Sequence, residues 1–117
     1  MRSLPELLDF LQEKMSMTEI YQPVIVLYLL EQDGAATKAE LGRVLSGYDE
    51  AVQEYYERIV MRWPKITLTK HDVVTYERQH KRFYLNFELD DPGLVRKAKQ
   101  ICEEKIRDWI EQRAGKS

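Results

Sequence analysis

The chain has 117 residues, of which 44% are hydrophobic and 32% are charged, and its formal net charge is −2. This length and balance predict one globular domain and exclude a disordered chain, while the near-neutral total points to no particular partner. The single cysteine, Cys102, excludes an internal disulfide. The start "MRSLPELLDF" lacks the pattern of a signal peptide, and the apolar run 24–30 is too short to cross a bilayer, so we expect a cytoplasmic protein.

Two helices are predicted in the first third of the chain. Ser3 and Glu6 have the spacing of a capping box, in which each side chain bonds the other residue's backbone N–H. The apolar residues that follow recur at helical spacing: Leu4, Leu7, Leu8, Leu11 and Met15. The segment from about 18 to 32 is apolar nearly all round, which predicts a buried central helix with Pro23 in its first turn. Asp33-Gly34 should end this helix.

A helix-turn-helix is predicted at about residues 37–63. Thr37 and Glu40 form a second capping box, and Gly47 is placed to end the helix that they begin. Asp49 can cap a further helix, which Pro64 should close. Two helices joined by a short glycine-containing turn are typical of this motif. The second helix is expected to turn outward Glu50, Glu54, Glu57, Arg58 and Met61.

The period of the apolar residues then changes from 3.6 to 2, which predicts a wing at about residues 65–87. Ile66 and Leu68 alternate with polar residues, and segments 73–76 and 83–85 are rich in strand formers, so three short strands are expected. The polar tip "ERQHKR" lacks an Asn-Gly or Asp-Gly pair, which favours a longer, mobile turn.

The last helix is predicted at about residues 91–113. Asp91 can cap it and Pro92 suits its first position. Its apolar stripe comprises Val95, Ala98, Cys102, Ile106, Trp109 and Ile110, with Leu94 and Ile101 widening one side. The predicted fold class is therefore α+β, mainly helical with a small antiparallel sheet: a winged helix-turn-helix with an N-terminal helix and a long C-terminal helix.

Few residues are arranged for catalysis. His71 and His80 have no cysteine or carboxylate pair at metal-ligand spacing beside them, and Cys102 belongs to an apolar helical stripe. The five glycines are scattered, so no phosphate-binding loop is present. We therefore expect neither an enzyme nor a metal or cofactor site.

The distribution of charge favours a nucleic-acid partner, because residues 64–86 hold five basic residues against two acidic ones, a net charge of +3. The expected phosphate contacts are Lys65, Lys70, His71, Arg78, His80, Lys81 and Arg82, with Arg58 and Arg62 adjoining and Lys38 and Arg43 as secondary contacts. Charge on a hairpin also protects any sheet edge from aggregation. Tyr76 and Tyr84 could stack on an unpaired base, but cross-strand packing explains them equally well.

The segments "GAATKAELGRVL", "YDEAVQEYYERI", "LTKHDVV" and "RFYLN" together resemble a winged helix-turn-helix domain. The longer stretch "EIYQPVIVLYLLEQDGAATKAEL" is similar to accessory modules fused to prokaryotic HNH-type nucleases and to restriction or helicase proteins. This resemblance covers about residues 18–112 and implies a role in recognising or positioning DNA in a mobile-element or defence setting. The acidic outward face of helix 49–63 departs from a typical major-groove reader.

Two other functions remain open at this point. A protein-interaction or dimerisation module could use the acidic surface around Glu50, Glu54 and Glu57, or the last helix if its apolar stripe is wider than the domain covers. A transcription regulator would normally need a dimer to span two half-sites.

Overall fold

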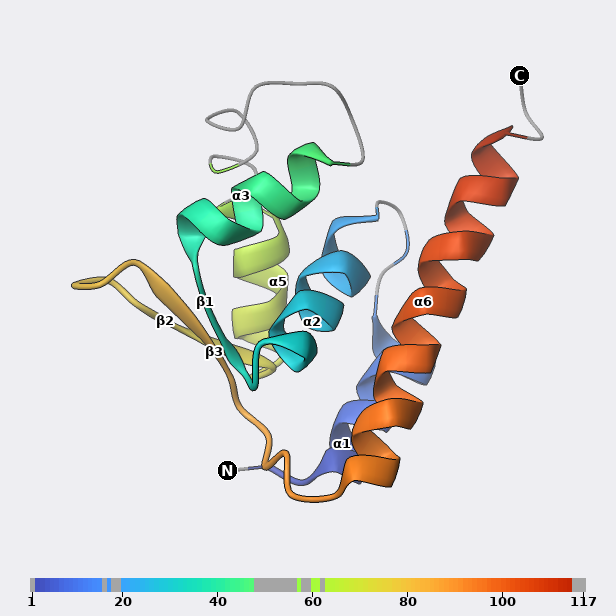
Figure 1. Ribbon diagram of the computed structural model, residues 1–117, viewed down its shortest axis with the longest axis horizontal. Coiled ribbons are helices and arrows are strands. Elements are labelled where there is room, and N and C mark those ends of the chain that lie inside the picture. Colours follow the sequence, from blue (N-terminus) through green and yellow to red (C-terminus); the bar gives the residue numbers. More distant parts are fainter. Residues whose placement is uncertain are drawn as a thin grey trace.

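The fold is mainly helical with a small three-stranded antiparallel sheet, which confirms the predicted α+β class. A computed structural model describes residues 2–15, 17, 20–47, 57, 60, 61 and 63–114, without the side chains of 63, 113 and 114. Figure 1 shows the sheet and its hairpin on one side of the molecule and the longest helix on the other, with a central helix between them. No helix in these ranges combines the length and the apolar character needed to cross a membrane.

The two N-terminal helices form where the sequence predicts them. Helix α1 (Leu4–Asp9) begins with the capping box of Ser3 and Glu6, and it continues into a π-helical turn, η1 (Phe10–Lys14). The expected apolar stripe of α1 and η1 is buried. Helix α2 (Tyr21–Glu31) has Pro23 in its first turn. It ends at Glu31, and the turn that follows contains Asp33 and Gly34, which have positive φ angles of 56° and 95°, a conformation that glycine adopts without strain.

A short strand that the sequence did not predict precedes the next helix. Strand β1 (Ala35–Thr37) runs directly into α3 (Lys38–Ser46), whose N-cap is Thr37 and whose C-cap is Gly47, as expected. The Thr37 hydroxyl accepts the backbone N–H of Glu40, and the Glu40 carboxylate accepts the backbone N–H of Thr37. The same threonine thus ends the strand and caps the helix.

The strand predicted at residues 66–68 is wrong, because these residues lie in helix α5 (Trp63–Lys70). Pro64 is the second residue of α5 and lies in its first turn. A proline in the first turn lacks only an N–H that would have no helical partner, so it favours a helix start. The predicted helix 49–63 lies mostly outside the described residues. The helix-turn-helix and wing boundaries are therefore wrong around residues 63–70, where α5 stands instead of a strand.

The hairpin itself forms as predicted, with strands β2 (Val74–Glu77) and β3 (Arg82–Leu85). Strand β3 lies between β1 and β2, and both pairings are antiparallel. In this register Tyr84 lies opposite Ala35 on one side and Thr75 on the other. The third strand of the sheet is thus β1, from the first half of the chain, and not the segment before the hairpin.

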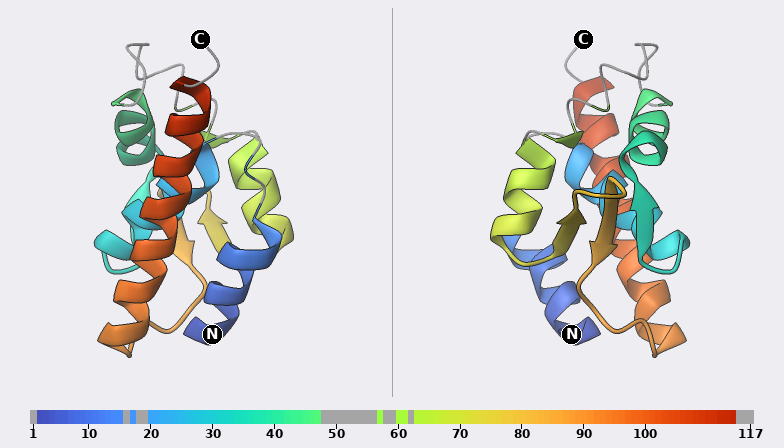
Figure 2. Two further views of the ribbon diagram at one scale, coloured as in Figure 1. Left: turned by 90° about the vertical axis from the view of Figure 1, so that its right-hand side faces the viewer. Right: turned by 90° about the vertical axis from the view of Figure 1, so that its left-hand side faces the viewer.

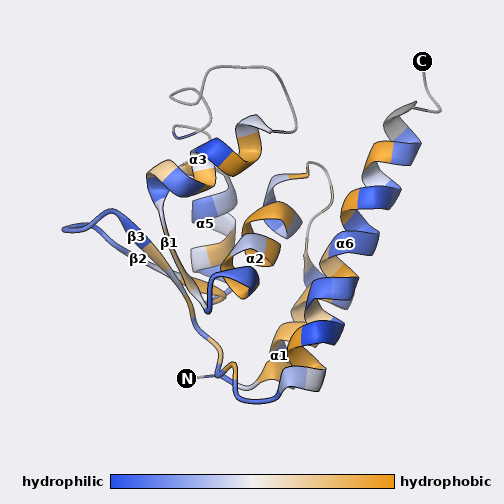
Figure 3. Ribbon diagram, in the orientation of Figure 1, coloured by the Kyte–Doolittle hydropathy of each residue, from blue (hydrophilic) through white to orange (hydrophobic). Residues whose placement is uncertain are grey.

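Helix α6 (Pro92–Ala114) begins where Asp91 and Pro92 predict, and the Asp91 carboxylate accepts the backbone N–H groups of Gly93 and Leu94. It packs along α2 and α1, and Figure 3 shows polar residues on much of its remaining surface. Its stripe residues Ala98, Cys102 and Ile106 are buried. Burial raises the pKa of the Cys102 thiol to about 12, so this cysteine is an inert part of the core.

Arg2 fastens the N-terminal arm to the sheet. Its guanidinium donates to the backbone oxygens of His71, at 2.8 Å, and Asp72, at 3.0 Å, and lies 4.9 Å from the centre of the Phe87 ring. Its backbone N–H also donates to the oxygen of Asn86. One residue therefore joins the start of the chain to the two segments at the base of the hairpin, before β2 and after β3.

We predict that Arg2→Ala lowers the free energy of unfolding by about 1–2 kcal/mol, because it removes the two hydrogen bonds to backbone oxygens, the exposed ion pair with Glu6 and the ring contact. Arg2→Lys should recover only part of this loss, since an ammonium group cannot reach two carbonyls in the planar geometry of a guanidinium. Urea unfolding measures both. Arg96→Ala, on the exposed face of α6, is the control and should change stability by less than about 0.5 kcal/mol. Equal stability of Arg2→Ala and the wild type would show that the arm does not hold the sheet.

Candidate nucleic-acid interface

The hairpin tip is ordered by its one carboxylate. The loop Arg78–Lys81 joins the strands, and the Glu77 side chain accepts the backbone N–H groups of Gln79 and His80, both at 2.9 Å, while His80 Nδ1 lies 2.7 Å from it. Partial burial acts to raise the pKa of Glu77, but the hydrogen bonds from the His80 side chain and the two amides outweigh it and lower that pKa. Lys81 has a positive φ of 54°. The carboxylate of the hairpin, Glu77, is thus engaged in hydrogen bonds within the turn.

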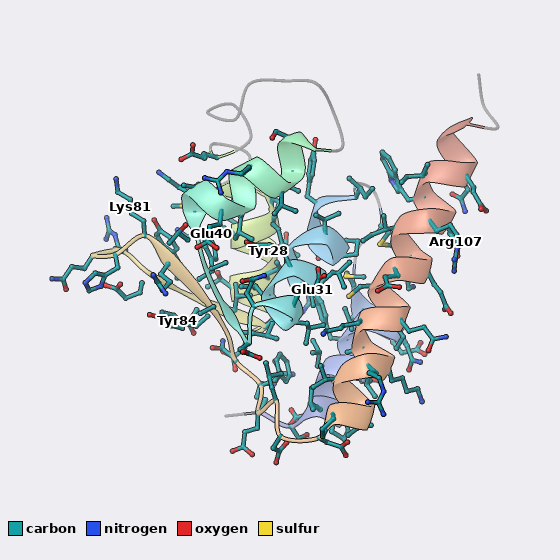
Figure 4. All side chains as sticks on the ribbon, viewed as in Figure 1. Tyr28, Glu31, Glu40, Lys81, Tyr84 and Arg107 are labelled. Atoms are coloured by element: carbon teal, nitrogen blue, oxygen red, sulfur yellow. The ribbon has the colours of Figure 1, made fainter. Side chains whose placement is uncertain are left out.

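The basic side chains of the tip point into solvent. Arg78, Lys81 and Arg82 are exposed, and none forms an ion pair within the described part of the chain. Lys38, at the start of α3, is partly exposed, and its backbone N–H donates to the oxygen of Lys81 at 2.8 Å, which brings this end of α3 beside them. Figure 4 shows Lys81 at the end of the hairpin that points away from α6. These four residues, Lys38, Arg78, Lys81 and Arg82, are called the basic tip below.

Helix α5 supplies basic residues along the other side of the hairpin. The Lys65 ammonium lies 5.0 Å from the centre of the Tyr76 ring, so Lys65 flanks β2. Lys70 is exposed at the last position of α5, and His71 follows it with its ring 5.5 Å from that of Phe10. Lys70 and His71 precede β2, so they lie at the end of the hairpin opposite the tip. The structure does not bring them into the basic tip.

The other predicted phosphate contacts are Arg43, Arg58, Arg62 and the two histidines. Arg43 is exposed on the second turn of α3, on the helix that begins with Lys38. Arg58 and Arg62 lie outside the described residues. His71 and His80 occupy opposite ends of the hairpin, and the residues that the structure describes contain no group of three metal-ligating side chains.

Sequence reasoning missed an exposed face of α5. Ile66 is 54% exposed, and Thr69 and Lys70 beside it are exposed as well. Residues three and four apart on a helix share a face, so these three side chains form one surface. The signal for this helix was Pro64: the chain's other prolines, Pro5, Pro23 and Pro92, also lie in the first turns of helices.

A hydrogen-bond network fixes the start of α3 beside the basic tip. The Tyr28 hydroxyl donates to one carboxylate oxygen of Glu40 at 3.1 Å, while the other accepts from Thr37. The backbone hydrogen bond from Thr37 is the largest cause that lowers the pKa of Glu40. Desolvation and the Glu40 carboxylate raise the pKa of Tyr28. Figure 4 shows Tyr28 and Glu40 pointing toward one another between α2 and α3.

We predict that Glu40→Gln destabilises the domain more at pH 7 than at pH 3. A carboxyl group whose pKa is lowered by folding stabilises the fold above its unfolded value of 4.5, and this contribution is lost as the pH falls through the folded pKa. Urea unfolding at both pH values measures the difference between variant and wild type. Glu88→Gln, an exposed carboxyl in the loop before α6, is the control. A difference of equal size at pH 7 and pH 3 would contradict the role of the Glu40 charge.

The surfaces considered for protein interaction offer little uncovered apolar area. On α6, Ile101 is 9% exposed, and Leu94 and Trp109 are partly buried against the core. Ile110 is the stripe residue that is left exposed, at 44%, contrary to its predicted inward position. Of the acidic helix, Glu57 is partly buried, with its backbone close to Gly42 of α3, and its other acids lie outside the described residues.

Comparison with known proteins does not assign this surface to a family. No protein-family model, curated protein or solved structure matches the chain. The basic tip and the exposed face of α5 are therefore interpreted from their own geometry and charge.

Proposed function

We propose that this chain is a winged-helix module that binds DNA, with the basic tip as the wing. The observation that carries the proposal is the gathering of unpaired cations at the end of a projecting hairpin, in a chain whose total charge is −2. An exposed set of lysines and arginines neutralises phosphates and releases counterions. The turn uses its own acid, Glu77, for backbone hydrogen bonds.

The order of the elements supports this proposal. A winged helix contains a helix, a short strand, two further helices and a hairpin, and its short strand pairs with the second strand of the hairpin. Among the elements that the structure describes, α2, β1, α3, α5, β2 and β3 occur in this order along the chain, and β1 pairs with β3. In this reading α5 occupies the position of the recognition helix. Residues 63–70 contain no acid, so the acidic face expected of helix 49–63 is not an objection to α5.

Contacts of the basic tip would position the protein on DNA and carry little sequence information. We infer that the module is non-catalytic, since the part of the chain that the structure describes holds no group of three metal-ligating side chains and its one cysteine is buried. The resemblance to accessory modules of prokaryotic nucleases and helicases suggests that it holds DNA for an associated enzyme. Ile66 and Thr69 are the residues of α5 that could add base contacts, because an apolar group suits a thymine methyl and a hydroxyl suits a base edge.

We predict that Lys81→Glu with Arg82→Glu weakens binding to duplex DNA and reduces the slope of log K against log salt by about 2, one for each lost phosphate contact. Fluorescence anisotropy of a labelled duplex at several salt concentrations measures both. Arg96→Glu with Lys97→Glu makes the same charge change on α6, on the opposite side of the molecule from the hairpin, and should leave the slope nearly unchanged. If both pairs lower the slope equally, attraction is set by total charge and not by the basic tip.

We predict a different signature for α5. Ile66→Ala with Thr69→Ala should leave the salt slope unchanged, because neither residue is charged, but should alter the preference among duplex sequences. Competition among a library of random duplexes, sequenced after binding, measures the preference. A uniform loss of affinity with the same preference would place α5 outside the groove.

A further inference from the structure

One aromatic side chain on the sheet is exposed and lacks an aromatic partner among the described residues. Tyr84 lies in the central strand β3 and is 40% exposed. Within the described residues its ring has no aromatic or cationic partner and its hydroxyl makes no hydrogen bond. Tyr76 differs, because its ring packs 4.6 Å from that of Phe83 and under the Lys65 ammonium. Cross-strand packing therefore accounts for Tyr76 and leaves Tyr84 without an explanation.

The face of the sheet around Tyr84 is not covered by a described helix (Figure 2). Strand residues alternate between the two faces, so Phe83 and Leu85 enter the core while Arg82 and Tyr84 point outward. The residues opposite Tyr84 are Ala35 and Thr75, which are too small to cover its ring. Figure 2 (right) shows this side of the sheet, and none of the described helices lies in front of it. In Figure 4, Tyr84 points away from the helices.

The charge beside Tyr84 is positive on the side of the hairpin tip. Arg82 lies two residues away on the same face, about 6.6 Å along the strand, and is exposed. On the side away from the tip, the Asn86 side chain accepts a hydrogen bond from the Thr75 hydroxyl and donates to Asp72. Glu77 lies opposite Arg82, but its carboxylate is held by the turn amides. An aromatic platform thus adjoins the basic tip.

We propose that the outer face of the sheet binds an unpaired nucleobase by stacking on Tyr84, with the phosphates of the same strand on Arg82 and the basic tip. This inference rests on the proposed function, since it extends the phosphate contacts of the basic tip to a single strand. Bases inside a duplex are stacked on one another, so their faces are not available to a ring on an open sheet. Every base has an aromatic face, so binding tolerates many sequences. The ligand is a single-stranded segment, such as the end or a splayed region of DNA.

The test is fluorescence anisotropy of the full 117-residue chain with a labelled 12-nucleotide oligothymidylate. Tyr84→Ala should weaken binding about 5- to 100-fold, the range expected for one lost base stack. Tyr84→Phe should bind like the wild type, because stacking needs the ring and not the hydroxyl. Tyr84→Thr repeats the loss of the ring with a good strand former, and circular dichroism checks the fold of each variant.

An abasic strand of the same length separates stacking from charge, because it keeps the phosphates and lacks the bases. Tyr84→Ala should leave its binding unchanged. Equal weakening of the abasic and thymidylate strands, or wild-type affinity of the folded variant for thymidylate, would overturn the proposal. Parallel titration of oligouridylate decides whether the strand is DNA or RNA, since both carry the same chemistry at this face.

The two proposals fail in different ways. Tyr84-dependent binding of the single strand with no binding of duplex would support the base site and overturn the duplex-binding role of the basic tip. If duplex binding depends on Lys81 and Arg82 but single-strand binding does not depend on Tyr84, the duplex-binding role of the basic tip is supported and the base site is overturned. No binding of either nucleic acid at low salt would overturn both.

Discussion

The burial of α2 on nearly every side is the constraint on which the rest of the structure depends. Val24, Val26 and Leu29 are at most 2% exposed, and together with neighbours around the helix they contact the sheet, α3, α5 and α6. A helix that is apolar all round stabilises a fold only when other elements surround it. The inner face of the sheet and the apolar stripe of α6 are therefore both used by the core. The outer face of the sheet and the hairpin tip are what remains exposed to solvent on that side.

The helix starts, the turn at Gly34 and the hairpin could be predicted, because neighbouring residues in the sequence determine them. The capping boxes of Ser3–Glu6 and Thr37–Glu40 satisfy backbone donors within three residues, so no distant contact can move the start of either helix. The start of α6 at Asp91 and Pro92 and the turn at Gly34 are also determined by neighbouring residues in the sequence. The hairpin was also found, because its β-rich strands flank a polar tip.

The two missed elements depend on distant contacts or on an ambiguous pattern. Strand β1 has three residues, two of them alanine, and is a strand only because β3 lies beside it. Residues 65–69 alternate between polar and apolar and include two β-branched threonines, which mimics a strand. Only Leu68 of this run is fully buried, while Ile66 is exposed, so the alternation does not describe two faces of a sheet. Pro64 marks the first turn of α5 in the same way that Pro23 and Pro92 mark the first turns of α2 and α6.

The correction at α5 changes which residues can face a nucleic acid. Assigning residues 65–68 to a strand placed Lys65 and Lys70 on the wing and gave the groove-facing role to an acidic helix. Because residues 63–70 form a helix, the Lys65 ammonium instead makes a cation–π contact with the Tyr76 ring of the hairpin. The register of β3 then separates two tyrosines that the sequence could not distinguish: Tyr76 stabilises the inner side of the hairpin, and Tyr84 is left on the outer one. The part of the Tyr84 ring that stays exposed on this sheet face leaves apolar area in contact with water, and a ligand that covered it would gain the free energy of burying that area.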